Sequence, residues 1–148
     1  MHPTAFINVS TSSEEDHELM AQLSKPGRDL MLRSMISMAA ADGDVADVET
    51  ATVAAVFEQV AGESVEAGEI EAAASGIVAD TSALKADLSG AADALEKSDK
   101  EAIVKAAYLV LIADGHVAAR ERKRLFDIAH ALDMPDIHIS AILENVES

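Results

Sequence analysis

The sequence predicts an all-α fold of seven or eight helices in two related halves, and three observations support this prediction. The 148 residues are 49% hydrophobic but only 3% aromatic, so the core must be built mainly from Ala and aliphatic residues. Such a composition favours close-packed helices over a β-sandwich, which relies on aromatic and β-branched residues. Apolar residues recur at helical spacing along most of the chain. One segment also occurs twice, as AAADGDVADVE at 39–49 and as LIADGHVAARE at 111–121.

The length suits a single domain, which we expect to span residues 13–148 behind a flexible polar arm at residues 1–12. A first helix is expected to begin in the sequence SSEED, where Ser12 and Glu15 fit the capping-box pattern. The KPG sequence at residues 25–27 is expected to end this helix. Its apolar stripe consists of Leu19, Met20 and Leu23.

The first half of the internal repeat, residues 28–62, is predicted to contain a buried helix, a DG turn and an amphipathic helix. Apolar residues surround nearly the whole helix expected from about Arg28 to Ala41, which indicates burial. Its methionines are interpreted as core filler. Gly43 is expected to end this helix, and Gly62 the next one. The apolar positions of that next helix are Val48, Thr52, Val53, Val56, Phe57 and Val60.

The middle segment, residues 63–96, is strongly acidic, with eight acidic residues and a single base, Lys85. Two helices are predicted in this segment from the spacing of its apolar residues. These positions are Ile70, Ala74, Ile77 and Val78 in the first helix and Leu84, Leu88, Ala91 and Leu95 in the second.

The second half of the repeat, residues 100–134, is predicted to follow the same plan. Ser98 and Glu101 fit a second capping box, and a helix that is apolar over most of its surface is expected to run from there to Gly115. Pro135 is expected in the first turn of a last helix. The apolar positions are Leu125, Ile128, Ala129 and Leu132 after the DG turn, and Ile139, Ile142, Leu143 and Val146 in the last helix.

The charge balance excludes several classes of function. The chain has 27 acidic and 11 basic residues and a net charge of −16. Nucleic acid is not expected as a partner, because phosphate binding needs a basic footprint. No stretch approaches the ~20 apolar residues of a membrane span, so direct membrane insertion is not expected. Cations or a basic protein patch are the natural counter-charges.

Other classes are excluded by what the sequence lacks. Without Cys, the chain has no disulfide, thiolate nucleophile or Cys-ligated metal centre. No nucleophile elbow, phosphate loop or HExxH motif occurs, so we expect no enzymatic activity. The spacing of His130 and His138 matches no zinc or iron ligand pattern. The N-terminal sequence MHPTAFINVS has no basic region followed by an apolar run, so a cytoplasmic protein is expected.

The repeated DG loop has two interpretations. In the first it is only a turn, because glycine at positive φ ends a helix and the later glutamate stabilises the start of the next helix. In the second, the pattern D-G-x-V-x-x-x-E is the second half of an EF-hand loop. The first half of that loop is missing, since its ligand positions would fall on Met38, Ala40, Val110 and Ile112. A standard EF-hand is therefore excluded.

A divalent-cation site shared between the two loops agrees with the ligand count, since calcium takes about six to eight oxygens. The second loop has His116 and Ala119 in place of Asp44 and Asp47, so at most one good site is expected. Calcium is the preferred ion and magnesium the alternative. A metal-free turn and a calcium-responsive sensor both stay open as alternatives. The candidate ligands are Asp42, Asp44, Asp47, Glu49, Asp114 and Glu121.

Four of the eleven basic residues form one short run, which consists of Arg120, Arg122, Lys123 and Arg124. One interpretation is a solvated helix surface that pairs with the acidic middle segment. The other is a patch that docks an acidic partner or the anionic face of a sister molecule.

The doubled motif A-D-G-x-V-x-x-x-E and the following sequence RLFDIAHALDMP resemble the TerB (tellurite resistance) family, from about residue 28 to the end. The resemblance implies a compact single-domain bundle of about seven helices with two pseudo-twofold related halves. The family's shared acidic residues fall on Asp42, Glu49, Asp114 and Glu121. Relatives often cap the second helix with Ser, Asp or Asn, where this chain has Ala46 and Ala118.

The resemblance also implies a function. TerB-like proteins are cytoplasmic bacterial proteins linked to tellurite, phage and chemical-stress resistance. They are thought to work beside calcium-binding TerD-type proteins and a membrane-embedded TerC-type partner. We therefore expect an acidic scaffold that docks partner proteins, and that reaches the inner membrane only through such a partner.

Overall fold

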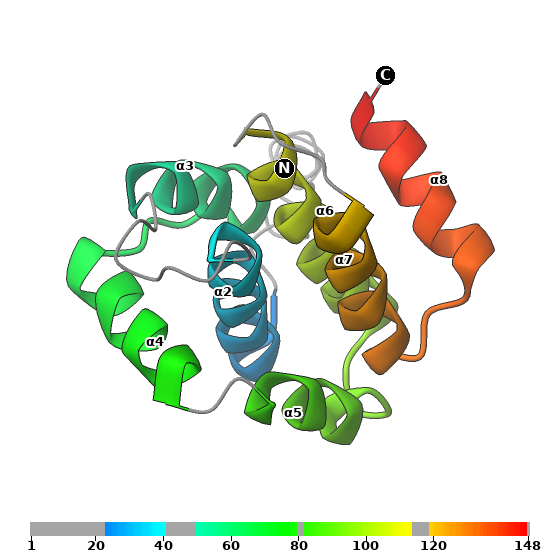
Figure 1. Ribbon diagram of the computed structural model, residues 1–148, viewed down its shortest axis with the longest axis horizontal. Helices are drawn as coiled ribbons and strands as arrows, with labels where there is room; N and C mark the ends of the chain where they lie inside the picture. The colour runs from blue at the N-terminus through cyan, green and yellow to red at the C-terminus, as the bar shows by residue number, and fades with distance from the viewer. Residues whose placement is uncertain (1–22, 41–49, 80–81, 114–118, 148) are drawn as a thin grey trace, which may run out of the picture.

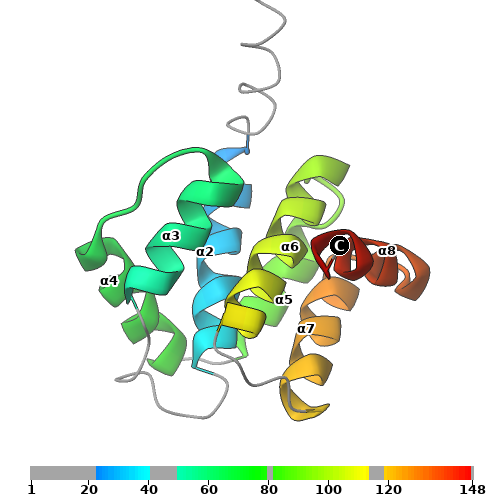
Figure 2. The same ribbon diagram turned by 90° about the horizontal axis from the view of Figure 1, so that it is seen from above.

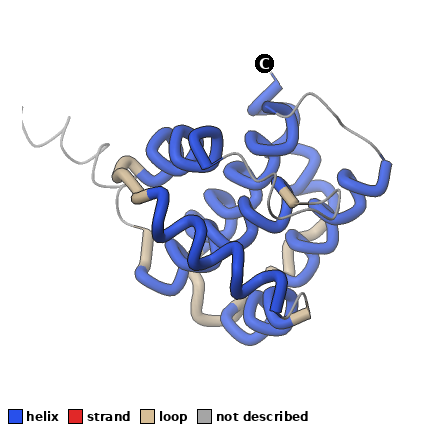
Figure 3. The backbone as a smooth tube through the Cα atoms, turned by 60° about the vertical axis from the view of Figure 1, so that its left-hand side comes forward, coloured by secondary structure: helices blue, strands red, loops and turns tan. Residues whose placement is uncertain are grey.

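The computed structural model describes residues 23–40, 50–79, 82–113 and 119–147, and every regular element in these ranges is a helix (Figures 1 and 3). The predicted all-α class is confirmed. The expected arm and most of the expected first helix fall in residues 1–22, outside the described residues, while Leu23, the last residue of its apolar stripe, is described and is not helical. The helices are α2 (Lys25–Ala39), α3 (Thr50–Ala61), α4 (Ala67–Ala79), α5 (Ala83–Ala91), α6 (Lys97–Ala113), α7 (Ala119–Ala131) and α8 (Asp136–Glu147).

Helices α2 and α6 form the centre of the bundle and pack on each other more extensively than any other pair (Figure 1). The sequence predicts both helices to be buried, and the structure confirms it. Met31, Met35 and Met38 of α2 lie in the core, so the methionines are core filler as predicted. The fully buried Ala106 and Ala107 of α6 allow close approach of neighbouring helices. Each buried Leu, Ile or Met side chain contributes about 1.5–3 kcal/mol of hydrophobic stabilisation.

The two halves of the molecule repeat one packing pattern over three helices each. Helix α4 packs on α2 and α3, and α8 packs on α6 and α7 in the same way. The halves also interlock, since α3 contacts α6 and α7 contacts α2. Figure 2 shows α3 and α4 on one side of the central pair and α7 and α8 on the other. The repeat therefore extends by one helix beyond each of the predicted ranges 28–62 and 100–134, and α5 connects the halves.

The start of α2 differs from the prediction. Helix α2 begins at Lys25 rather than at about Arg28, so the KPG sequence lies inside its first turn. Proline suits this position, because the N–H groups of the first turn have no helical partner. Ser24 caps the helix, and its Oγ accepts a hydrogen bond from the Gly27 N–H at 3.1 Å.

Two helix ends also differ from the prediction, and a third agrees with it. Helix α2 ends at Ala39 rather than Ala41. Helix α5 ends at Ala91, and Leu95, which was expected to continue it, lies buried in the following turn. Gly62, with a φ of 76°, follows the end of α3 as predicted, because glycine adopts this left-handed conformation without strain.

Two helix starts in the second half need correction. Helix α6 already includes Lys97, so Ser98 is not its N-cap and the capping box of Ser98 with Glu101 is wrong. Pro135 directly precedes α8, which begins at Asp136, one residue after the predicted position. None of the helices in the described part of the chain combines the length and the apolar character needed to cross a bilayer.

Candidate functional site

The N-terminal ends of α2 and α6 meet at a buried junction. Asp99, in the first turn of α6, is only 2% exposed. Its carboxylate accepts hydrogen bonds from the Ser24 hydroxyl at 2.8 Å and from the Ser24 backbone N–H at 3.4 Å. A Cβ at Gly27 would lie only 2.9 Å from Ser24 Oγ and 3.1 Å from Asp99 Cγ. In the register that aligns the two DG segments, Gly27 corresponds to Asp99, so equivalent positions of the two halves face each other, as residues near a twofold axis do.

Since their N-terminal ends meet, α2 and α6 run in the same direction, and their C-terminal ends lie together at the other end of the bundle (Figures 1 and 2). Helix α2 leads from there into the first DG segment, and α6 into the second. Arg124, near the start of α7, donates a hydrogen bond to the carbonyl of Ser37 in the last turn of α2 at 3.2 Å. The helices that flank the two DG segments therefore lie close together at this end.

Most of the predicted metal ligands lie outside the described residues, namely Asp42, Asp44, Asp47, Glu49 and Asp114. Glu121 lies partly buried in the first turn of α7, as the helix-dipole argument predicts. Within the described ranges, no group of three or more His, Asp or Glu residues could hold a metal ion. His130 and His138 pair with separate carboxylates, the first with Asp136 at 2.5 Å. A cation site at this end therefore depends on the side chains of the two DG segments.

The predicted docking residues contact different parts of the molecule, because consecutive residues of a helix point about 100° apart. Lys123 is exposed and pairs at 3.1 Å with a carboxylate one turn later in α7. Arg122 lies near enough to the Tyr108 hydroxyl of α6 to oppose the rise in its pKa. Arg124 reaches the end of α2. The backbone of Arg120 belongs to α7, but its side chain is outside the described part.

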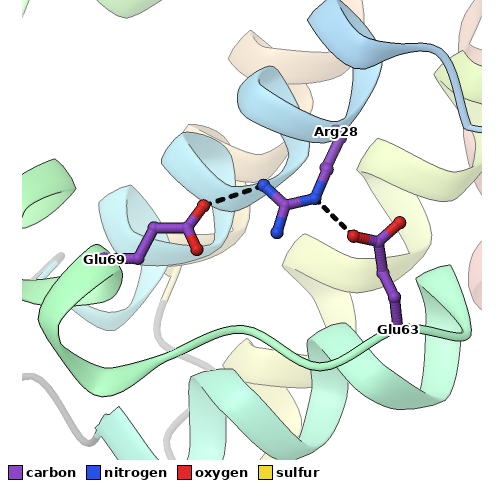
Figure 4. A network of polar contacts seen from close by, with 3 residues as sticks. All are labelled: Arg28, Glu63 and Glu69. Atoms are coloured by element: carbon purple, nitrogen blue, oxygen red, sulfur yellow. Dashed lines mark hydrogen bonds and ion pairs between the residues drawn. The ribbon is translucent and has the colours of Figure 1, made fainter.

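The acidic middle segment is held by Arg28 of α2, a residue that the sequence did not mark as functional (Figure 4). Arg28 Nε lies 2.6 Å from Glu63 Oε1, and Arg28 Nη1 lies 2.8 Å from Glu69 Oε2. The guanidinium carbon also lies 4.9 Å from the centre of the Phe57 ring, within cation–π range. Hydrogen bonds to Glu69 and Glu63 raise the pKa of Arg28 above its ordinary value. One side chain of α2 thus holds both the α3–α4 connection and the first turn of α4.

A second arginine of α2 binds the same acidic segment further along. Arg33 lies 2.8 Å from Asp87 of α5 and 3.6 Å from Asp29 on its own helix. Among the described residues, the ion pairs of segment 63–96 therefore go to α2. The solvated-surface interpretation of the basic run in α7 assigned these acidic residues to α7 instead.

A groove of about 510 Å³ lies between α6 and α8, and we call it the α6/α8 groove. Both walls show the helical spacing i, i+3, i+4 and i+7. Leu23 and Val60 add apolar side chains to the lining. The walls consist of Ser98, Glu101, Ala102 and Lys105 on α6, joined by Asp99, and of His138, Ala141, Ile142 and Asn145 on α8.

Two polar contacts join α6 and α8 at different levels. His138 Nε2 lies 2.7 Å from Glu101 Oε2 near the start of both helices. Further along, the Tyr108 hydroxyl donates a hydrogen bond to the Glu147 carboxylate. Burial, followed by the Glu147 contact, raises the pKa of the Tyr108 hydroxyl, and Arg122 opposes this shift. The order of these contacts means that α6 and α8 run in the same direction.

Comparison with protein families identifies the chain. The family model of tellurite resistance protein TerB matches residues 28–143, which include both DG segments and most of the helical bundle. No curated protein and no solved structure matches this chain. The family match covers well over half of the sequence and agrees with the all-helical fold. The chain therefore belongs to the TerB family of tellurite resistance proteins.

Proposed function

We propose that this TerB-family chain is a non-catalytic acidic scaffold for tellurite and chemical-stress resistance. It binds one divalent cation between its two DG segments and docks other resistance proteins. The observation that carries this proposal is the shared position of two helix ends. Helices α2 and α6 enter their DG segments at the same end of the bundle. Carboxylates from both segments can therefore approach a single ion.

The chemistry of the donor set supports a hard cation. The candidate ligands offer only carboxylate oxygens, and calcium accepts about six to eight of these in a flexible geometry. Magnesium requires a nearly ideal octahedron and keeps several waters, so a site assembled from two segments favours calcium. The net charge of −16 also attracts cations to the protein. An ion held in this way would connect the two halves at the end opposite the Asp99 junction. The proposed ligands are Asp42, Asp44, Asp47, Glu49, Asp114 and Glu121.

The docking part of the proposal rests on charge complementarity. An acidic surface attracts basic patches on partner proteins and speeds their association. The proposed partners are the TerD-type proteins and the membrane-embedded TerC-type protein of the cytoplasmic resistance system. The basic run would dock an acidic partner surface, and Arg122 and Lys123 are its exposed described members. Contact with the inner membrane would be made through the TerC-type partner alone.

A metal-free interaction domain is the second candidate function, and the position of Glu121 favours it. A glutamate in the first turn of α7 stabilises the helix through its dipole without any ligand. On this account the DG segments serve only as turns between helices, and the acidic surface is left for partner proteins.

Calorimetric titration of calcium and magnesium into the metal-free full-length protein at physiological salt distinguishes the two candidates. The cation proposal predicts saturable binding of about one ion, a higher Tm with calcium, and loss of both in Asp42→Asn/Glu49→Gln. The matched control is Asp93→Asn/Glu96→Gln, which removes the same charge from exposed residues beside α5. Weak heat that fades with salt and survives in the first variant would favour the metal-free domain.

A further inference from the structure

The α6/α8 groove has an apolar floor that the described helices leave partly open to water. Ala102 of α6 and Ile142 of α8 are only half-buried, and both line the groove. Its volume of about 510 Å³ lies within the ~300–1,000 Å³ range of ligand pockets. Two walls with i, i+3, i+4 and i+7 spacing form the kind of surface that accepts an amphipathic helix.

The chain itself enters this groove at one end. Leu23 lines the groove and packs against the hydrophobic core. The next residue, Ser24, is bonded to Asp99 in the first turn of α6, so the chain arrives at the N-terminal end of that helix. Residues 13–22 therefore connect directly to the open end of the groove. They belong to the segment in which the sequence predicts a helix with one apolar stripe.

The distance that a helix would cover from the entry point of the chain can be compared with the α6 wall. Leu23 directly follows the segment, and the seven residue steps from it back to Asp16 span about 10 Å at 1.5 Å per helical residue, as do the seven steps from Ser98 to Lys105 on α6. Asp16 lies three and four residues before Leu19 and Met20, so in a helix it would share their face. A segment that runs from Leu23 along the groove, antiparallel to α6, therefore ends beside Lys105.

This register produces two matches between the segment and the groove. Leu19 and Met20 come level with Ala102, whose small side chain leaves room on the floor for larger ones. Asp16 comes level with Lys105, the one Lys or Arg among the described lining residues. Lys105 forms no ion pair with another described residue, so its charge is available for a carboxylate.

We propose that residues 13–22 form a helix that occupies the α6/α8 groove of the same chain. Leu19, Met20 and Leu23 cover its apolar floor, and Asp16 pairs with Lys105. The N-terminal segment of the chain would thus fill the α6/α8 groove, which lies in the second half of the bundle. This role is separate from cation binding, because the DG segments leave from the opposite ends of α2 and α6.

Hydrogen exchange of the full-length chain, followed by mass spectrometry over residues 13–22, tests the proposal. Asp16→Lys and Lys105→Glu should each raise the exchange rate about two- to fivefold, the effect expected for loss of a surface ion pair. The double variant should return the rate to that of the wild type. Glu14→Lys is the matched control, because it makes a similar charge change on the opposite helix face and should not be rescued by Lys105→Glu.

A second variant tests the apolar part of the contact. Leu19→Asp/Met20→Asp should raise the hydrogen-exchange rate of residues 13–22 by on the order of tenfold or more, because carboxylates replace the two apolar side chains that cover the groove floor. Equal exchange in this variant and the wild type would overturn the proposal, as would additive effects in the charge-swap double variant. Protection that increases with protein concentration would assign the groove to a second copy, and would also overturn it.

Discussion

The two halves of the bundle share their helix order but attach their third helices by different chemistry. In the first half, Arg28 of α2 binds Glu69 in the first turn of α4. In the second half, Glu101 of α6 pairs with His138 in the first turn of α8. Each pair joins the start of a central helix to the start of the third helix. Acid and base have changed places between the two halves.

The surroundings of the two pairs differ, and the α6/α8 groove, at about 510 Å³, is larger than the pocket of about 280 Å³ between α2 and α4. Arg28 also binds Glu63 and lies over the Phe57 ring. In the register of the DG repeat, Lys100 and Ala129 correspond to Arg28 and Phe57, so the second half lacks both the guanidinium and the ring. The larger groove lies beside its third helix, α8. Two halves can therefore share one core while their edges differ, with more ion pairs at the first edge and more open space at the second.

The shared core should show the largest effect if the halves form one unit. Met31 of α2 and Ile103 of α6 occupy equivalent positions of the repeat, and both are fully buried. Replacing either with Ala should lower the free energy of unfolding by about 2–5 kcal/mol, because a cavity remains. Urea denaturation should still show a single transition in each variant. A large cost in only one of the two variants would mean that the halves do not share a core equally.

The Asp99 junction should give the next largest effect. Asp99→Ala removes the acceptor of two Ser24 hydrogen bonds, and should lower the free energy of unfolding by about 1–3 kcal/mol. Asp93→Ala changes an exposed residue near the start of the same helix, and should stay within about 0.5 kcal/mol of the wild type. Equal stabilities of the two variants in urea would show that the junction does not hold the halves together.

The edge chemistry can be tested at two repeat-related positions. Arg28→Met should lower the free energy of unfolding by about 1–2 kcal/mol, since two ion pairs and a cation–π contact are lost at a site with some solvent access. Hydrogen exchange should increase in α4. Lys100→Met should change stability by no more than about 0.5 kcal/mol. Similar costs for both changes would contradict the proposed difference between the two edges.

The hydrogen bond from Tyr108 to Glu147 should contribute about 1 kcal/mol at neutral pH, so Tyr108→Phe should cost that amount. The pKa of Tyr108 is raised in the folded state above its ordinary value of 10.0. Its contribution should therefore be complete below pH 10 and be lost as the pH rises through the raised pKa. Urea unfolding below and above pH 10 should show this loss in the wild type. The Phe variant should not show this loss. If the free energy of unfolding changed with pH equally in the wild type and the Phe variant, the hydrogen bond from Tyr108 to Glu147 would be contradicted.

The smallest predicted effect has the opposite sign. The buried hydroxyl of Ser34 in α2 has no hydrogen-bond partner among the described residues, and the equivalent position of the second half is Ala106. Ser34→Ala should raise the free energy of unfolding by about 0.5–1 kcal/mol, because an unsatisfied polar group leaves the core. A lower Tm for this variant would mean that the hydroxyl has a partner after all.

The fold could be predicted from the sequence because apolar periodicity is a local property. The burial of Met31 and Ile103 follows from their position in helices that are apolar nearly all round. The start of α2 could not be predicted in this way. Its cap, Ser24, is supported by Asp99 from a distant part of the sequence, and this contact lets the KPG sequence begin a helix instead of ending one.

In the candidate site, too, the features set by local sequence could be predicted, and those set by tertiary packing could not. The doubled DG segment and the position of Glu121 in the first turn of α7 could be predicted, because both follow from a local pattern that occurs twice. The partners of Arg28 could not, since the acidic segment offers eight similar carboxylates and only the packing of α4 selects Glu63 and Glu69. The groove was missed because Ala102 and Ala141 are small and resemble ordinary core positions in a helical pattern.

The proposed cation site takes its ligands from both halves, at the end of the bundle where both DG segments begin. Calcium titration of the full-length chain tests this site, with Asp42→Asn and Asp114→Asn measured separately and Asp93→Asn as control. We expect about one ion per chain and a loss of affinity of about tenfold or more, at least about 1.4 kcal/mol, in each DG variant but not in the control. Binding that weakens in only one DG variant, or that is absent from the wild type, would contradict a shared site.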